Sequence, residues 1–236
     1  MKKILSIMRK GIETFSMIQP GDRIAVGVSG GKDSVALLSA LSRYRLFSPH
    51  PFELEAITLD MGFKGMDFSP IQKFCAQLDI PYTIQKTKIG PIVFETRHEK
   101  NPCAFCARMK RGALHNLALS RNCKKIAFGH HADDVIETFL MSLFYEGRIN
   151  TFLPVTYLDR KDITLIRPFV YLKEMEILNS KAVQQLPIVA NTCPIDGATK
   201  REEIKQLIQT LKHRMPDLDD KIMTAIQNKK QFRLWF

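Results

Sequence analysis

The hydrophobic pattern of the chain alternates between short apolar runs and longer stretches with a helical period. The apolar runs predict buried strands at Ile24–Val28, Leu54–Leu59, Tyr82–Gln85, Lys125–Gly129 and Thr164–Arg167. Helices are predicted at Ser34–Tyr44, Asp67–Leu78, Ala104–Leu119, Asp133–Tyr145, Lys173–Gln185, Thr199–Lys212 and Leu218–Asn228, and at the N-terminus, where Ile4, Ile7, Met8 and Ile12 share a face. This order predicts an α/β fold, with a mostly parallel sheet, helices on both of its faces, and helical extensions at both ends.

No internal repeat, low-complexity tract or long linker divides the chain. We therefore expect an N-terminal helix at residues 1–20, a catalytic domain at 21–190 and a C-terminal helical extension at 191–236. The composition, 45% hydrophobic and 25% charged, is that of a soluble globular protein. No apolar run approaches the ~18 residues that cross a bilayer, and Arg9 and Lys10 interrupt the apolar N-terminal segment. We expect a cytoplasmic protein without a membrane contact.

The densest motif, Ser29-Gly30-Gly31-Lys32-Asp33-Ser34, follows the first predicted strand and opens a helix. Adjacent glycines can take positive φ angles and turn successive N–H groups inward, which together with a helix N-terminus makes an anion site. The two serine hydroxyls and the lysine ammonium add donors and positive charge. This motif predicts a phosphate-binding loop.

A second motif, Gly129-His130-His131-Ala132-Asp133-Asp134, follows the fourth predicted strand, and Glu137 lies one turn further on. Its carboxylates could simply cap a helix. Facing a nucleotide, however, they would hold Mg²⁺ through oxygen ligands. In a parallel sheet both motifs and Asp60, at the end of the second strand, meet at the carboxyl edge. One of the two histidines is expected to pack beneath the loop.

Five cysteines in a chain without an export signal indicate reduced, metal-binding or catalytic thiols. Cys103 and Cys106 form a CxxC pair at a predicted helix start, where Arg and Lys neighbours favour thiolates. The pair alone fits a redox couple, a zinc half-site or an iron–sulfur half-site, and Cys193 is a third ligand if the C-terminal part folds back. Cys75 and Cys123 are expected to be buried bystanders.

The formal net charge of +11 suits a polyanionic partner such as a nucleic acid. The candidate contacts are Lys2, Lys3, Arg9 and Lys10, then Arg108, Lys110 and Arg111, and finally Lys229, Lys230 and Arg233.

The Ser29–Ser34 motif resembles the PP-loop of the ATP-pyrophosphatase superfamily, whose members cleave ATP to AMP and pyrophosphate. The second motif resembles one shared by tRNA lysidine synthetases and tRNA 2-thiocytidine synthetases, and the segment from Cys103 to Gly112 resembles the cysteine-containing helix of the latter. Further similarity runs through Phe144-Tyr145-Glu146-Gly147, Ile166-Arg167-Pro168 and Pro187-Ile188. The segment Pro194-Ile195-Asp196-Gly197 departs from the usual pattern of the family.

The resemblance implies an enzyme with the adenine-nucleotide alpha-hydrolase-like fold that adenylates and then thiolates C2 of a cytidine of tRNA, at position 32 of the anticodon loop. It implies ATP, Mg²⁺ and a 4Fe-4S cluster as cofactors, a sulfur donor such as a cysteine desulfurase, and is compatible with a homodimer. The implied catalytic residues are Lys32, Asp33 and Asp133. The implied ATP site is Ser29, Gly30, Gly31, Lys32, Asp33, Ser34, Asp60, Gly129 and His130. The implied metal ligands are Cys103, Cys106 and Cys193 for the cluster, and Asp133 and Asp134 for magnesium.

Other interpretations stay open at this point. A persulfide on Cys103 or Cys106 could replace the cluster as the sulfur carrier. A lysidine synthetase-like enzyme, another PP-loop ligase using an amine, or a thiolase of another tRNA base would share the ATP site. A non-enzymatic iron–sulfur sensor would bind nucleic acid without turning over ATP.

Overall fold

Six strands form one sheet in the computed structural model, which describes residues 1–97, 101–190, 192–194 and 199–228. The strands are β1 (Arg23–Gly27), β2 (Glu53–Asp60), β3 (Tyr82–Lys86), β4 (Lys125–Ala127), β5 (Val155–Leu158) and β6 (Ile163–Ile166), in the order β3-β2-β1-β4-β6-β5. All neighbours pair in parallel except β5 and β6, which are antiparallel. The predicted, mostly parallel sheet is confirmed. The edge strand β5 was not predicted, because its four residues are only partly buried and form no apolar run.

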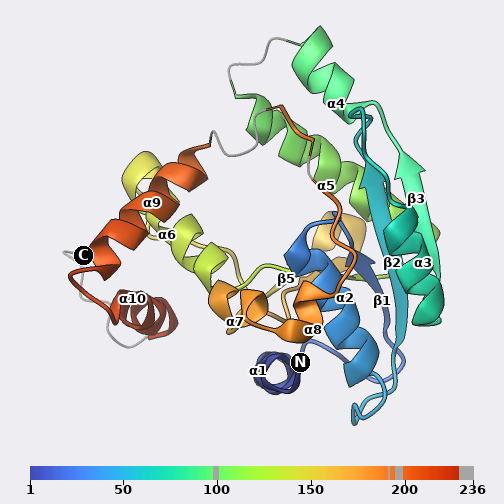
Figure 1. Cartoon of the computed structure of the whole chain (residues 1–236), viewed down its shortest axis with the longest axis horizontal. Helices are drawn as coiled ribbons and strands as arrows, with labels where there is room; N and C mark the ends of the chain where they lie inside the picture. The colour runs from blue at the N-terminus through green and yellow to red at the C-terminus, as the bar shows by residue number, and fades with distance from the viewer. Residues whose placement is uncertain (98–100, 191, 195–198, 229–236) are drawn as a thin grey trace.

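Alternate residues of the central strands enter two separate cores, since successive side chains of a strand point to opposite faces. Ile24 and Val26 of β1 pack with helices α1 (Lys2–Thr14), α2 (Lys32–Tyr44) and α3 (Ser69–Gln77). Ala25 of β1 and Ile57 of β2 pack on the opposite face with α5 (Pro102–Ser120). Helices therefore cover both faces, as predicted, and the N-terminal helix is part of the larger core (Figure 1).

The C-terminal helices α9 (Lys200–Lys212) and α10 (Leu218–Gln227) pack against α6 (Ala132–Glu146) at one side of the sheet (Figure 1). Ile136 and Leu140 of α6 form a small core with Ile204 and Ile208 of α9. Residues 195–198 and 229–236 of the predicted extension, including three of the basic candidate contacts, lie outside the described residues.

The prediction of one continuous helix over Lys173–Gln185 is wrong. It consists of α7 (Glu174–Leu178) and α8 (Lys181–Gln184), separated where Ser180 takes an extended backbone with ψ 109°. Asn179 and Ser180 are poor helix formers whose side chains favour caps and turns. Short helical segments not predicted from the sequence are α4 (Ile89–Pro91), η1 (Ile92–Thr96) and η2 (Asp159–Lys161). Among the described residues no helix combines the length and apolar character needed to cross a membrane.

The parallel strands end together at one edge of the sheet. β1 leads into the Ser29–Ser34 segment, β2 ends at Asp60, β4 leads into Gly129, and β6 leads into Arg167. The elements that the sequence singled out therefore meet at the carboxyl edge, where open α/β sheets bind ligands.

Candidate active site

The glycine loop (Ser29–Ser34) connects β1 to α2, and its two glycines differ in conformation. Gly30 has φ +97°, and a Cβ built there would lie 3.0 Å from Cβ of Val189. Gly31 has φ −70° and is the N-cap of α2. Only Gly30 therefore uses the positive φ that glycine allows, because the start of the helix fixes an extended backbone at Gly31.

The two serine hydroxyls of the glycine loop bind within the loop. Ser34 Oγ donates to the carbonyl of Gly31 at 2.9 Å and accepts the backbone N–H of Ser29 at 3.1 Å. Ser34 is buried. Ser29 Oγ lies 3.2 Å from Ser34 Oγ. Both hydroxyls thus shape the loop, and the N–H groups at the start of α2 are left as donors for an anion.

Lys32 and Asp33 occupy the first turn of α2 and lie side by side. Lys32 Nζ lies 3.2 Å from Asp33 Oδ2. Oδ1 of Asp33 is buried and has no hydrogen-bond partner. Burial raises the pKa of Asp33 above its usual value, although the charges of Lys32 and His131 act in the opposite direction. An unpartnered buried carboxylate oxygen is costly in the free protein and is a position for a cation.

Gly129 brings the second motif against the glycine loop. A Cβ at Gly129 would lie 2.9 Å from the carbonyl carbon and oxygen of Asp33 and 3.1 Å from the backbone nitrogen of Ser34. All three atoms are backbone, so they cannot rotate away. Gly129, a predicted ATP-site residue, therefore allows the two motifs to approach because it has no side chain.

The two histidines of the second motif have different surroundings. The ring of His130 packs between Phe128 and Phe152, with centroid distances of 5.6 and 5.1 Å. Burial lowers the pKa of His130 to about 4, so its imidazole is neutral at pH 7. His131 is the N-cap of α6 and points to Asp33 and the α6 carboxylates. His131 is therefore the histidine that faces the carboxylates, whereas the resemblance had placed His130 in the ATP site.

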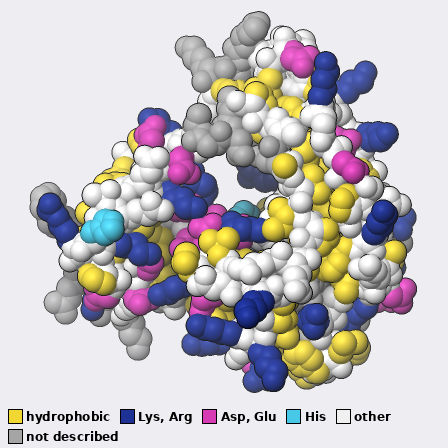
Figure 2. All heavy atoms as spheres, in the orientation of Figure 1, with side chains coloured by type: hydrophobic (Ala, Val, Ile, Leu, Met, Phe, Trp, Pro, Cys, Tyr) yellow, Lys and Arg dark blue, Asp and Glu magenta, His cyan; other side chains and the backbone are white. Residues whose placement is uncertain are grey.

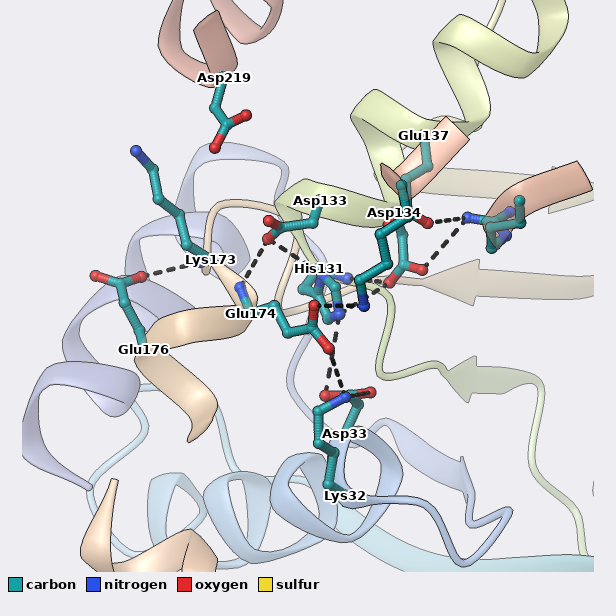
Figure 3. A network of polar contacts seen from close by, with 12 residues as sticks. Lys32, Asp33, His131, Asp133, Asp134, Glu137, Lys173, Glu174, Glu176 and Asp219 are labelled. Carbon is teal, nitrogen blue, oxygen red and sulfur yellow. Dashed lines mark hydrogen bonds and ion pairs between the residues drawn. The ribbon is translucent and has the colours of Figure 1, made fainter. Parts of the chain in front are cut away.

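His131 sits among three carboxylates (Figure 3). Its Nδ1 lies 3.4 Å from Asp133 Oδ2, and its Nε2 lies 3.5 Å from Asp134 Oδ2 and 4.0 Å from Asp33 Oδ1. Burial alone lowers the pKa of His131, but the contact with Asp133 and the charges of Asp134 and Asp33 outweigh it and raise the pKa. The surrounding carboxylates therefore favour the protonated form of His131.

Asp133, Asp134 and Glu137 of α6 are already bound by other groups. Asp133 Oδ2 accepts the backbone N–H of Glu174 at 2.7 Å. Asp134 Oδ2 accepts the backbone N–H of His131 at 2.9 Å and caps α6, as a carboxylate at a helix start can. Arg201 Nη1 lies 2.9 Å from Glu137 Oε2 and 3.5 Å from Asp134 Oδ1.

Three of these partners, Glu174, Arg201 and Lys205, were missed from the sequence. Glu174 Oε1 lies 2.8 Å from Lys32 Nζ, and its Oε2 lies 3.0 Å from Lys205 Nζ. Glu174 begins α7, Arg201 lies in the first turn of α9 and Lys205 lies one turn further on, so in the sequence all three look like ordinary charges of surface helices. Only the fold brings them to the glycine loop.

The acidic side chains fit a magnesium ion that is shared with phosphates. In the part of the chain that the structure describes, no group of three His, Cys, Asp or Glu side chains could hold a metal ion. Mg²⁺ is commonly bound through one or two carboxylates plus substrate phosphates and waters. The unpartnered Asp33 Oδ1 is the best placed ligand, and Asp133 and Asp134 retain further lone pairs. Asp33 therefore joins the predicted pair.

The CxxC pair lies in the first turn of α5, whose N-cap Asn101 accepts the N–H of Ala104 at 3.2 Å. Cys103 is exposed, Cys193 is half-buried, and Cys106 is buried in an apolar cluster with Met61, Ile89 and Val93. Burial raises the pKa of Cys106, Lys110 lowers it, and the nearby Cys193 and Cys103 raise it further. The expected thiolate at Cys106 is therefore wrong for the free protein.

Cys193 and Cys103 both act on Cys106, so these two thiols each lie within electrostatic range of it. Within the described residues these thiols, like the carboxylates, do not form a group of three placed to hold a metal ion, although soft sulfur donors are the ligand type that an iron–sulfur cluster takes, as thiolates. Cys75 and Cys123 are fully buried elsewhere, and burial raises the pKa of Cys75 to about 11. Their expected role as bystanders agrees with this burial.

A short segment connects the glycine loop to the cysteines. The backbone N–H of Val189 donates to the carbonyl of Gly30 at 3.0 Å, and Cys193 follows four residues later. Four residues span at most about 14 Å. The chain thus folds back over the glycine loop, which is the condition that the sequence set for Cys193 as a third ligand. This face is hollowed between α6 and α9 on one side and α5 on the other (Figure 2).

Asp60, the predicted neighbour of the adenosine, ends β2 and accepts the N–H of Gly62 at 2.9 Å. Thr87 holds the carbonyl of Asp60 through its hydroxyl at 2.8 Å and its N–H at 2.8 Å. The residue therefore stabilises the turn after β2. β2 pairs directly with β1, so this turn is adjacent to the glycine loop.

Fold and site together define a PP-loop protein, and the family model described as the PP-loop domain matches residues 3–211. The chain is 37% identical over 230 residues to the tRNA-cytidine(32) 2-sulfurtransferase of Pelobacter propionicus, covering 96% of this chain and 86% of the relative. The protein of the same name from Coxiella burnetii is 35% identical, covering 99% and 92%. The chain belongs to the tRNA-cytidine(32) 2-sulfurtransferase family.

A solved structure supports the same fold. The U34-tRNA thiolase NcsA from Methanococcus maripaludis, determined with its 4Fe-4S cluster, superimposes with a TM-score of 0.73 at 25% identity. The match covers 94% of this chain and 76% of that protein. The predicted fold class is confirmed by this likeness and by the six-stranded sheet.

Proposed function

We propose that this protein is an ATP-dependent tRNA sulfurtransferase that replaces O2 of cytidine 32 by sulfur. The observation that carries the proposal is the short path from Gly30 through Val189 to Cys193, which joins a phosphate-binding loop to a three-thiol site. An amine-using PP-loop ligase has no need of that second site. The names of the curated relatives support tRNA as the substrate and cytidine 32 as the target.

In the first step O2 of the cytosine attacks the α-phosphorus of ATP, and pyrophosphate leaves. The N–H groups at the start of α2 and the ammonium of Lys32 stabilise the charge on the leaving pyrophosphate. Asp33 and Asp133 would hold the Mg²⁺, which would supply positive charge to the phosphates. The neutral His130, between two aromatic rings, contributes no positive charge to the site.

In the second step a sulfur nucleophile attacks C2, the C2–O bond breaks, and AMP leaves with that oxygen. Cys103, Cys106 and Cys193 would hold the 4Fe-4S cluster. Such a cluster would supply iron as the binding site for an exogenous sulfur species. The apolar cluster of Met61, Ile89 and Val93 around Cys106 limits access of water to this side.

The tRNA is held by positive charge beside the thiols. Arg108, Lys110 and Arg111 are on α5, just after Cys106. The guanidinium groups of Arg97 and Arg108 lie 5.2 and 5.7 Å from the ring centroid of Phe105, inside the CxxC motif. The target base must leave its stack to reach the site, as the single-stranded anticodon loop allows. The proposal extends to a cysteine desulfurase as the sulfur source, to the cytoplasm as the location and to a homodimer.

The test uses protein purified without oxygen and a tRNA transcript with cytidine 32 and uridine 34. We expect ATP-dependent release of pyrophosphate and 2-thiocytidine at position 32, detected by mass spectrometry of nuclease fragments. Cys106→Ala should lose iron, labile sulfide and thiolation but keep ATP binding. Asp33→Ala should keep iron and labile sulfide but lose adenylation, and with it thiolation. Cys75→Ala, another buried cysteine, is the matched control and should retain the cluster.

Other outcomes decide between the alternatives. Thiouridine at position 34 would favour the reaction named for the NcsA structure. Thiolation without iron would favour a persulfide on Cys103 or Cys106. Pyrophosphate release that depends on ammonia and not on the cysteines would overturn the proposal in favour of an amine-using ligase.

A further inference from the structure

Lys32 is the lysine of the glycine loop, yet in this structure its ammonium is held by carboxylates. Its Nζ lies 2.8 Å from Glu174 Oε1 and 3.2 Å from Asp33 Oδ2. Figure 3 shows the Glu174 side chain pointing from α7 to the start of α2. The Glu174 side chain is 17% exposed and that of Lys32 is 27% exposed, so water screens this pair less than a surface pair.

Glu174 has a second cation, which allows it to release the first. Its other oxygen lies 3.0 Å from Lys205 Nζ on α9. A largely buried carboxylate that loses its only partner carries a large free-energy cost. With Lys205 in place, Glu174 stays compensated when Lys32 turns to another anion.

Movement of Glu174 itself is restricted by its backbone. The N–H of Glu174 donates to Asp133 Oδ2 at 2.7 Å, so the start of α7 is fixed to α6. The Glu174 side chain therefore remains beside the glycine loop, and Lys32, at the end of a flexible four-carbon chain, is the group that changes partner.

We propose that Glu174 is a positioning residue that holds Lys32 in the free enzyme and competes with the phosphates of ATP for its ammonium. The inference rests on the proposed function only in taking ATP as the ligand of the glycine loop. ATP binding then replaces the Lys32–Glu174 contact by a Lys32–phosphate contact, while Lys205 keeps Glu174 neutralised. Because Glu174 competes for Lys32, the protein binds ATP more weakly than it would without the Glu174 carboxylate.

The test compares Glu174→Gln with Glu137→Gln, which removes the same charge from a carboxylate that pairs with Arg201 instead of Lys32. Glu174→Gln should lower the thermal midpoint of the free protein and yet bind Mg²⁺–ATP about fivefold more tightly, measured by calorimetry on the anaerobic holoenzyme. Glu137→Gln should change ATP affinity less, since only general repulsion is relieved. General structural damage would not make binding tighter.

A double-mutant cycle isolates the competition. In a Lys32→Met background, Glu174→Gln should change ATP affinity no more than Glu137→Gln does. In Glu174→Gln alone, the KM for ATP should fall, and kcat for pyrophosphate release should change by a smaller factor. Weaker ATP binding by Glu174→Gln would show that the carboxylate aims Lys32 at the phosphates and would overturn the proposal. Equal effects of the two Gln variants, or an effect that persists without Lys32, would also overturn it.

The two proposals fail in different ways. Absence of ATP binding by the wild-type protein would contradict the proposed function. Normal ATP binding and thiolation with no effect of Glu174→Gln would contradict only the competition for Lys32.

Discussion

Gly129 gives the sharpest test of how the two motifs are held together. Gly129→Ala would place a methyl group 2.9 Å from the carbonyl carbon and oxygen of Asp33 and 3.1 Å from the nitrogen of Ser34. Ordinary carbon contacts lie at about 3.5–4.0 Å. The backbone segments must therefore separate by roughly 0.5–1 Å, because neither side of the contact is a side chain that could rotate.

The expected cost follows from this geometry. Overpacking of a rigid contact costs about 1–3 kcal/mol, and a backbone contact belongs in the upper half of that range. For a protein of 236 residues, about 2–3 kcal/mol lowers the thermal midpoint by roughly 4–12 °C. The displacement also moves Asp133 relative to Asp33, and a 1 Å misplacement at a reacting centre can reduce the rate about 100-fold.

The assay pairs thermal unfolding with tRNA-dependent pyrophosphate release for Gly129→Ala and for a matched control. Gly112→Ala lies in the interior of α5, where a Cβ meets nothing within 4 Å. That substitution should stabilise the protein by about 0.5–1 kcal/mol, since alanine is the better helix former. If Gly129→Ala left both the midpoint and the rate unchanged, the contact between the motifs would not be needed and the reasoning would be refuted.

Two further predictions concern the glycine loop and its histidine. Gly30→Ala should destabilise the protein by about 1–2 kcal/mol, because Gly30 has φ +97° and its added Cβ would lie 3.0 Å from Val189. Adding Val189→Ala should restore only the stability lost to the steric contact. If the double variant regained full stability, the positive φ would carry no cost. His131→Asn should lose more unfolding free energy at pH 6 than at pH 8.5 in urea titrations. The raised pKa of His131 means that its contribution is fully present below about 6.5 and is lost as the pH rises through the folded-state pKa. His130→Gln should show the opposite trend, with a smaller loss at pH 6, because burial lowers the pKa of His130 to about 4 and near pH 6 the unfolded chain binds a proton that the folded protein does not. Equal losses for His131→Asn at both pH values would contradict its raised pKa.

The regular elements were predictable because each depends on local periodicity. The strand Ile24–Val28 and the helix Ser34–Tyr44 correspond to β1 and α2 within about three residues. Prediction failed where the local pattern is weak. The helix expected at Lys173–Gln185 is broken near Ser180, and β5 gains its regular backbone only by pairing with β6.

The residues of the candidate site likewise include some that the sequence predicted and some that it could not. The glycines, the lysine and the carboxylates at the carboxyl ends of strands could be recognised from the sequence, because a parallel sheet brings those strand ends to one edge. Glu174 and Arg201 could not be found, because a charged residue in the first turn of a surface helix has no local signature of its partner.

The sequence by itself determined the sheet, the phosphate-binding loop and the thiol pair, because these depend on neighbours within a few residues. The tertiary structure decided which histidine faces the carboxylates, which cations neutralise them and where Cys193 arrives. These depend on contacts between residues more than 30 positions apart, such as Lys32 with Glu174 and Gly30 with Val189. Charge, burial and close approach at such contacts are properties of the packed chain, and they have no counterpart in the order of residues alone.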